Sequence, residues 1–173
     1  MHTLILGGIK SGKSRLAESL ATAVGGQDVL FIATATESDD EMRERINKHR
    51  NSRPAHWTVV EEPLAIAGVI HEQSHPCVVV DCLTLWLTNL LLCDDADQFP
   101  RQRSELIAVL SQIKNPVIMV SNEVNMGVVP LGELSRRFCD EAGLLHQELA
   151  AICDNVVLTV AGIPTYIKGS PGE

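Results

Sequence analysis

A glycine-rich loop close to the start of the chain has the residue types and spacing of a phosphate-binding site. The loop consists of Gly7, Gly8, Ile9, Lys10, Ser11, Gly12, Lys13 and Ser14. It matches Gly-x-x-x-x-Gly-Lys-Ser, a pattern whose backbone N–H groups surround phosphates while the following helix dipole favours negative charge. Lys13 would reach the β and γ phosphates of a nucleotide, and Ser14 would ligate Mg²⁺. A chance match in a glycine-rich turn is the alternative, but an apolar strand before the loop and helical spacing after it argue against that reading.

Asp81 is a second residue whose position in the sequence suits a role in the reaction. It follows the apolar run 78–80, so its carboxylate would lie at the carboxyl end of a buried strand, where open α/β sheets bind ligands. There it would hold Mg²⁺ directly or through water, as a Walker B aspartate does. Because an apolar helix follows, Asp81 could instead be a helix cap, and the two roles are compatible.

Residues 48–57 concentrate positive charge in an otherwise acidic chain. They contain Lys48, Arg50 and Arg53 and two histidines, His49 and His56. The cluster could contact a triphosphate. Composition alone favours another interpretation, in which a solvated basic helix end complements the helix dipole and His49 is a core histidine on the apolar face.

The segment 71–75 matches the zinc-protease pattern His-Glu-x-x-His. That pattern requires both imidazoles on one continuous helix and a third ligand. Pro76 disfavours helical conformation at His75, and no third ligand is evident, so we predict no zinc site here.

Residues 121–127 follow another buried strand, so their polar side chains are also expected at the ligand edge of the sheet. An ordinary connection between a strand and a helix is equally consistent with this segment.

Composition and charge exclude several classes of protein. The chain has 173 residues, of which 45% are hydrophobic and 21% charged, as expected for one folded domain. Its net charge of −8 argues against nucleic acid or an anionic membrane as partner. The five cysteines are odd in number and lack a Cys-x-x-Cys pair, which favours a reducing cytoplasm. Residues 1–8 leave no room for a signal peptide, and the apolar stretch 77–92 is too short and too polar for a membrane span.

The remaining pattern predicts the elements that position these residues. Strands are expected at 3–6, 29–32, 78–80, 116–120 and 156–160, with an edge strand at 165–168. Helices are expected at 14–24, 38–50, 63–72, 83–92, 105–113 and 131–152. Strands alternating with helices predict a single α/β domain with a mostly parallel sheet and helices on both faces.

With these motifs in order, nearly the whole chain resembles the bifunctional adenosylcobinamide kinase and adenosylcobinamide-phosphate guanylyltransferase family of cobalamin biosynthesis. The segments that carry the resemblance are 7–14, 32–34, 39–42 with 45–46 and 49–50, 53–57, 81–84 with 88–91, and 122–124 with 126–130. The Asp-Asp-Glu-Met run 39–42, followed by His49 on the same predicted helix, is the most specific of them.

The resemblance implies a RecA-like P-loop fold, commonly a homotrimer, and two reactions on adenosylcobinamide. A triphosphate, GTP or ATP, phosphorylates its aminopropanol hydroxyl; GTP then loses pyrophosphate to leave GMP on a histidine, which passes it to the new phosphate. The histidine maps to His49, with His56 a weaker second choice. Besides the loop, the resemblance implies nucleotide contacts by Thr34, Arg50, Arg53 and either Glu61 or Glu62.

Small departures from the family pattern concern Lys10, where Arg is usual, Asn125, where a small residue is usual, and a short segment 94–103. These departures concern the activity expected of the kinase half and the details of corrinoid contact. Two other functions fit the phosphate loop: a small-molecule kinase without a covalent step, and a regulatory nucleotide-binding switch. Only the transferase requires GMP bonded to protein.

Overall fold

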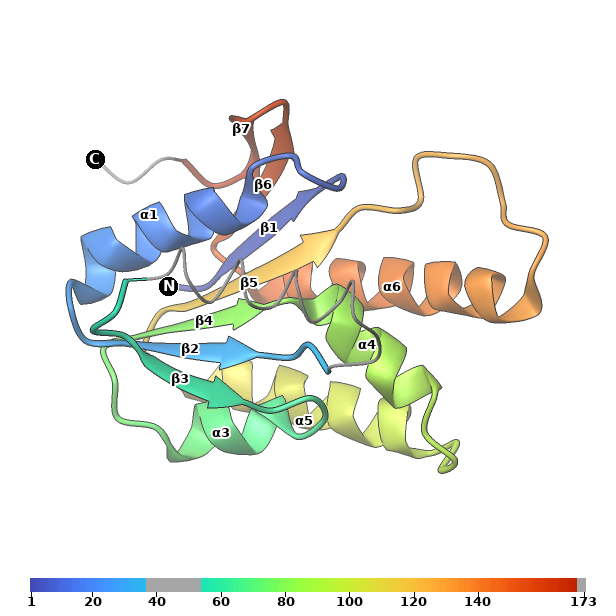
Figure 1. Cartoon of the computed structure of the whole chain (residues 1–173), viewed down its shortest axis with the longest axis horizontal. Helices are drawn as coiled ribbons and strands as arrows, with labels where there is room; N and C mark the ends of the chain where they lie inside the picture. Colours follow the sequence, from blue (N-terminus) through green and yellow to red (C-terminus); the bar gives the residue numbers. More distant parts are fainter. Residues whose placement is uncertain (37–53, 171–173) are drawn as a thin grey trace.

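The computed structural model describes residues 1–36 and 54–170, and its centre is a seven-stranded sheet in the order β3-β2-β4-β5-β1-β6-β7 (Figure 1). The strands are β1 (Thr3–Gly7), β2 (Val29–Ala33), β3 (Thr58–Glu61), β4 (Cys77–Asp81), β5 (Val117–Asn122), β6 (Asn155–Val160) and β7 (Ile163–Lys168). All neighbouring strands are parallel except β6 and β7, which pair antiparallel. The predicted mostly parallel α/β sheet is therefore confirmed.

Helices cover both faces of this sheet. The described helices are α1 (Lys13–Gly25), α3 (Ile66–Glu72), α4 (Leu83–Leu91), α5 (Gln98–Gln112) and α6 (Glu133–Ile152). Helix α1 lies on one face, and the other four lie on the opposite face (Figure 1). The helix predicted at 38–50 lies outside the described residues.

Burial on both faces explains why the central strands read as continuous apolar runs. Side chains alternate between the two sides, so Val79 packs with Ala17 and Ala21 of α1, while Val78 and Val80 join the larger core under the other helices. That larger core contains the fully buried Trp86, whose indole N–H donates a hydrogen bond of 2.7 Å to the Leu64 carbonyl.

Two helix starts differ most from the prediction. Helix α3 begins at Ile66 and not at Pro63, because a Glu62 carboxylate oxygen accepts hydrogen bonds of 2.8 Å from the N–H groups of both Leu64 and Ala65 and holds a turn there. Helix α5 begins at Gln98, well before 105, because the buried Phe99 adds an apolar contact. Pro100 is tolerated in that first turn, where N–H groups have no intrahelical partner.

Strand β3 was not predicted. It carries only two apolar residues, Val59 and Val60, and its burial pattern is mostly exposed, as expected for an edge strand. Its pairing with β2 stabilises a strand that its own sequence pattern does not indicate. Within residues 1–36 and 54–170, no helix is long and apolar enough to cross a membrane.

Candidate active site

The glycine-rich loop connects β1 to α1 at the carboxyl edge of the sheet, as predicted (Figure 1). Gly12 directly precedes α1 and has a left-handed φ of 98°, and Lys10 has a φ of 56°. A side chain at Gly7 would overlap the carbonyl oxygen of Thr159. Glycine is therefore favoured at position 12 by the left-handed φ and at position 7 by the lack of space for a side chain.

The turn between β6 and β7 supports this loop from the side. The N–H of Gly162 donates a hydrogen bond of 2.9 Å to the carbonyl of Ser11, and a side chain at Gly12 would come within 3.1 Å of the Gly162 Cα. On β6 the hydroxyl of Thr159 donates to the carbonyl of Leu6 at 2.9 Å. The end of β1 and the loop are thus both fixed by the β6–β7 hairpin.

Lys13 lies inside the loop that it is predicted to serve. Its ammonium donates a hydrogen bond of 2.7 Å to the carbonyl oxygen of Gly8, and its side chain is only 8% exposed. Burial lowers the pKa of Lys13 from its ordinary value of 10.5, while the nearby side chains of Cys82 and Asp81 act in the opposite direction. The cation of the loop therefore lies close to the predicted Walker B carboxylate.

Ser11 and Ser14 provide the hydroxyls of the loop. Ser14 is half-buried in the first turn of α1. Ser11 is buried, and its hydroxyl oxygen has no hydrogen-bond partner among the described residues. An unpaired buried hydroxyl at this place fits a loop shaped to surround a polar ligand.

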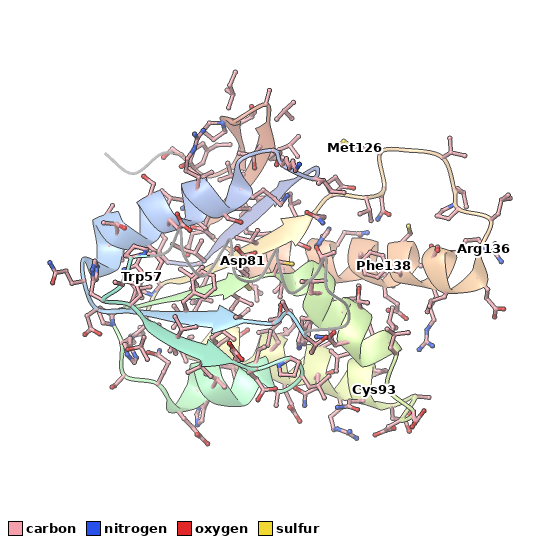
Figure 2. All side chains as sticks on the ribbon, viewed as in Figure 1. Trp57, Asp81, Cys93, Met126, Arg136 and Phe138 are labelled. Carbon is pink, nitrogen blue, oxygen red and sulfur yellow. The ribbon has the colours of Figure 1, made fainter. Side chains whose placement is uncertain are left out.

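Asp81 is the last residue of β4, aligned with Ala33 of β2 and Val120 of β5. The N-terminal cap of α4 is Cys82, and no side-chain hydrogen bond caps this helix within the described part of the chain. Asp81 is therefore not the cap that sequence allowed as its alternative role. Figure 2 shows it near the middle of the molecule, at the end of its strand.

Thr34 fixes the segment that carries Asp81. Thr34 is fully buried. Its hydroxyl accepts a hydrogen bond of 2.9 Å from the N–H of Cys82 and donates one of 2.7 Å to the carbonyl of Cys82. Its own carbonyl accepts from the Asn89 side chain at 2.8 Å. The hydroxyl of Thr34 is thus engaged by the backbone of Cys82, the residue that follows Asp81.

The predicted Mg²⁺ ligands, Ser14 and Asp81, are a hydroxyl and a carboxylate, which are the oxygen donors that Mg²⁺ prefers. Both are only partly buried and lie on elements that meet at the loop. No cluster of three or more His, Cys, Asp or Glu side chains occurs in residues 1–36 and 54–170. A few protein ligands completed by phosphate and water are typical of Mg²⁺ in nucleotide sites, so the residues fit this ion.

The two candidate glutamates differ in availability. The carboxylate of Glu62 holds the turn before α3. Glu61 ends β3 and is exposed. Of the two, Glu61 has the carboxylate that is not engaged in that turn.

The end of β5 and the residue after it lie beside the phosphate loop. The N–H of Glu123 donates to the carbonyl of Gly7 at 3.0 Å, and the N–H of Asn122 donates to the hydroxyl of Thr84 at 2.7 Å. Behind them the buried imidazole of His146 lies 2.8 Å from the Ser121 hydroxyl, which is 3.4 Å from that of Thr84. Burial lowers the pKa of His146, and the charge of Glu123 opposes this.

Three predicted site residues lie outside the part of the chain that the structure describes, and a fourth lies away from the phosphate loop. His49, Arg50 and Arg53 lie outside the described residues. His56 is exposed and lies two residues before the start of β3, so it lies at the amino edge of the sheet, opposite the phosphate loop. Its neighbour Trp57 is buried against Phe31 and marks that far end in Figure 2. His56 is therefore remote from this chain's own loop, which weakens it as a second choice for the nucleophile.

The pattern 71–75 also has a plain structural reading. Helix α3 ends at Glu72, and Gln73 is extended. His75 is beyond the helix, and its imidazole lies 3.2 Å from the Thr58 hydroxyl. The two imidazoles do not share one continuous helix, as the sequence predicted from Pro76.

The chain is similar to proteins of one known family along nearly its whole length. The family model described as cobinamide kinase / cobinamide phosphate guanyltransferase matches residues 3–167. The bifunctional adenosylcobalamin biosynthesis protein CobP of Pseudomonas aeruginosa is 55% identical over 173 residues, covering 99% of each chain. The corresponding protein CobU of Escherichia coli is 41% identical, covering 97% of this chain and all of the relative.

Solved structures show similarity in fold alone. The flagellar accessory protein FlaH from Methanocaldococcus jannaschii superposes with a TM-score of 0.52 at 13% identity, covering 98% of this chain and 78% of the other. An ATPase from the type III secretion system of pathogenic bacteria gives 0.53 at 14% identity, covering 91% and 50%. These similarities agree with the mostly parallel α/β sheet, covered by helices on both faces, that the sequence predicted.

Proposed function

This chain belongs to the cobinamide kinase / cobinamide phosphate guanyltransferase family, and we propose that it performs both reactions on adenosylcobinamide with His49 as a covalent carrier. It is an enzyme of the kinase and guanylyltransferase type. The observation that carries the proposal is the combination of a complete phosphate loop with a family match over residues 3–167.

The kinase half uses the loop. Its N–H groups and Lys13 bind the β and γ phosphates of GTP or ATP, and the aminopropanol hydroxyl oxygen attacks the γ-phosphorus. A phosphorus–oxygen bond to the substrate forms as the bond to the nucleoside diphosphate breaks, and the hydroxyl proton is released to solvent. Mg²⁺ held by Ser14 and Asp81 would neutralise charge on the phosphates when bound. Pairing of Thr34 with Cys82 keeps Asp81 in place for this role.

The guanylyl half uses His49. A neutral imidazole nitrogen attacks the α-phosphorus of GTP, and the bond to pyrophosphate breaks as a phosphorus–nitrogen bond forms. An oxygen of the corrinoid phosphate then attacks the same phosphorus and releases the histidine, giving adenosylcobinamide-GDP. Lys48, Arg50 and Arg53 spread the developing charge, and Arg50, Arg53 and Glu61 contact the nucleotide. Support comes from the residue match at 39–50 and from the remote position of His56.

Labelled GTP tests the covalent step. Incubation with Mg²⁺ and GTP labelled at the α-phosphate should add one GMP mass to the peptide containing His49, while label at the γ-phosphate should not stay on protein. A phosphorus–nitrogen bond should be acid-labile and alkali-stable. An adduct on another residue would refute the role of His49, and a phosphorylated corrinoid without any adduct would leave a kinase with no covalent step.

The family resemblance also implies a homotrimer, and the cysteine pattern favours a reducing cytoplasm. Sedimentation equilibrium of the pure protein tests the first of these, because a trimer of the 18.8 kDa chain differs clearly in mass from a monomer or dimer.

A further inference from the structure

A row of three polar side chains runs from α6 through β5 to the start of α4, two helices that lie on the same face of the sheet (Figure 1). The imidazole Nε2 of His146 on α6 lies 2.8 Å from the hydroxyl oxygen of Ser121 on β5. That oxygen lies 3.4 Å from the hydroxyl oxygen of Thr84, in the first turn of α4. His146 is 7% exposed and Ser121 is 3% exposed. Because buried polar groups cost free energy unless they are paired, this polar row indicates a role beyond filling space.

The far end of the polar row is bonded to the strand end that holds the phosphate loop. The N–H of Asn122 donates a hydrogen bond of 2.7 Å to the Thr84 hydroxyl. Asn122 is aligned with Gly7, the first residue of the loop. The N–H of the next residue, Glu123, donates to the Gly7 carbonyl at 3.0 Å. The polar row therefore contacts the segment that fixes the start of the loop.

Thr84 also connects the polar row to the segment of Asp81. It lies three residues after Asp81, in the first turn of the helix that follows that strand. On the other side, the hydroxyl of Thr34 is bonded to both backbone groups of Cys82. The Asp81 segment is thus held from the β2 side by Thr34 and from the β5 side by Thr84.

Within the part of the chain that the structure describes, the His146 ring is bonded on one side only. Its Nε2 lies beside Ser121, whereas its buried Nδ1 has no hydrogen-bond partner there. The other buried residues of α6, Ala142, Leu145 and Leu149, are apolar. A leucine at position 146 would fill the space without leaving a ring nitrogen unpaired, so packing alone does not account for the histidine. What the imidazole supplies is the contact with Ser121.

We propose that His146 is a positioning residue for phosphoryl transfer, which acts through Ser121 and Thr84 to hold the Asp81 segment and the start of the phosphate loop at a fixed separation. The inference rests on the proposed function, because it takes the loop to bind the nucleotide phosphates and Asp81 to hold Mg²⁺. His146 itself is buried against Ser121 and contacts neither ligand. A displacement of about 1 Å between reacting groups can lower a rate about 10²-fold, so loss of the row should slow the reaction more than it weakens nucleotide binding.

Three substitutions separate positioning from stability. His146→Leu removes the bond to Ser121, and His146→Gln keeps a group that can form it. His2→Leu removes another buried histidine, also 7% exposed, which directly precedes β1 at the opposite edge of the sheet. The kinase step on cobinamide is measured as kcat and KM, with Mg²⁺ and whichever of GTP and ATP the parent uses, at a temperature where circular dichroism shows each variant folded.

His146→Leu should lower kcat about tenfold or more, with a smaller change in the KM for nucleotide. His146→Gln should recover most of the rate, and His2→Leu should retain the parental kcat. A parental kcat in folded His146→Leu would overturn the proposal. So would an equal loss in His146→Gln, which would separate the rate from the bond to Ser121, or an equal loss in His2→Leu, which would indicate destabilisation alone.

If His146→Leu does not fold, the next two members of the row decide the matter. Ser121→Ala and Thr84→Val should each lower kcat, and a parental rate in either variant would overturn the proposal. A parent that phosphorylates no cobinamide would refute the proposed function, and this inference with it. That result is distinct from an active parent whose rate does not depend on His146.

Discussion

The ammonium of Lys13 lies 2.7 Å from the carbonyl oxygen of Gly8, inside the loop that both residues help to form. An ammonium has three donors, so it can keep this bond and still reach a phosphate. The contact orients a long side chain that would otherwise lose rotamer freedom on binding. The cation is thus preorganised for the position where phosphate charge develops.

Lys13→Ala should therefore reduce both the kinase and the guanylyl steps by about 10²-fold or more, as removal of one preorganised charge at a phosphate site does. Initial rates with subsaturating nucleotide measure this, and circular dichroism should show an intact fold. Parental rates for both steps would contradict the role of the loop.

Asp81→Asn should raise the Mg²⁺ concentration that gives half-maximal rate, since an amide is a weaker ligand than a carboxylate. Thermal stability should change little, because Cys82 and not Asp81 caps α4. Asp94→Asn, on an exposed carboxylate, is the control and should leave the metal titration alone. An unaltered titration in Asp81→Asn would remove this residue from the metal site.

Thr34→Val keeps the shape of the side chain but removes the hydroxyl that bonds both backbone groups of Cys82. The orphaned groups should cost about 1–3 kcal/mol in the free energy of unfolding. Thr34→Ser restores the hydroxyl and should recover most of this loss in urea unfolding. If Thr34→Val is as stable as the parent while nucleotide affinity falls, the side chain is a ligand contact and not a positioning residue.

The core of the fold could be predicted because its strands are buried on both faces. The run 78–80 is apolar throughout, as a strand covered by helices on each side must be. Strand β3 escaped prediction because only Val59 and Val60 are apolar, and it exists through pairing with β2.

The site residues that belong to short, continuous sequence motifs could be predicted. Lys13 and Asp81 belong to short motifs, and each motif by itself indicates a position at the end of a strand. The contacts that hold these motifs in place could not be predicted in this way. Gly162 and Ser11, like Thr34 and Cys82, are far apart in sequence and come together only in the folded sheet. His146 in particular resembles any other residue of an amphipathic helix until its contact with Ser121 is seen.

His146 should make the protein less stable in acid. Burial lowers its pKa in the folded state below the ordinary value of 6.5, so the unfolded chain binds more protons as pH falls through 6.5. Stability is therefore full above that pH and decreases below it, by at most about 1.4 kcal/mol per pH unit for this group. His2, also buried with a lowered pKa, acts in the same direction.

Urea unfolding of the parent and of His146→Gln at pH 7.5 and pH 5.5 measures this contribution. The glutamine can still bond with Ser121 but does not titrate, so the variant should lose less stability between the two pH values. An equal loss in both proteins would show that His146 is not the group that senses acid.

His49 and His56 provide the sharpest test of the covalent mechanism, because they are close in sequence but are assigned different roles. His49→Ala should abolish the guanylyl step while retaining much of the kinase rate, since phosphorylation of a hydroxyl requires the loop and metal but no covalent histidine. His56→Ala should retain both steps, because His56 is exposed at the amino edge of the sheet, opposite the loop. Separate assays of corrinoid phosphate and corrinoid GDP formation distinguish the two reactions. Equal loss of both in His49→Ala would indicate a structural histidine, and loss of only the guanylyl step in His56→Ala would transfer the nucleophile to His56.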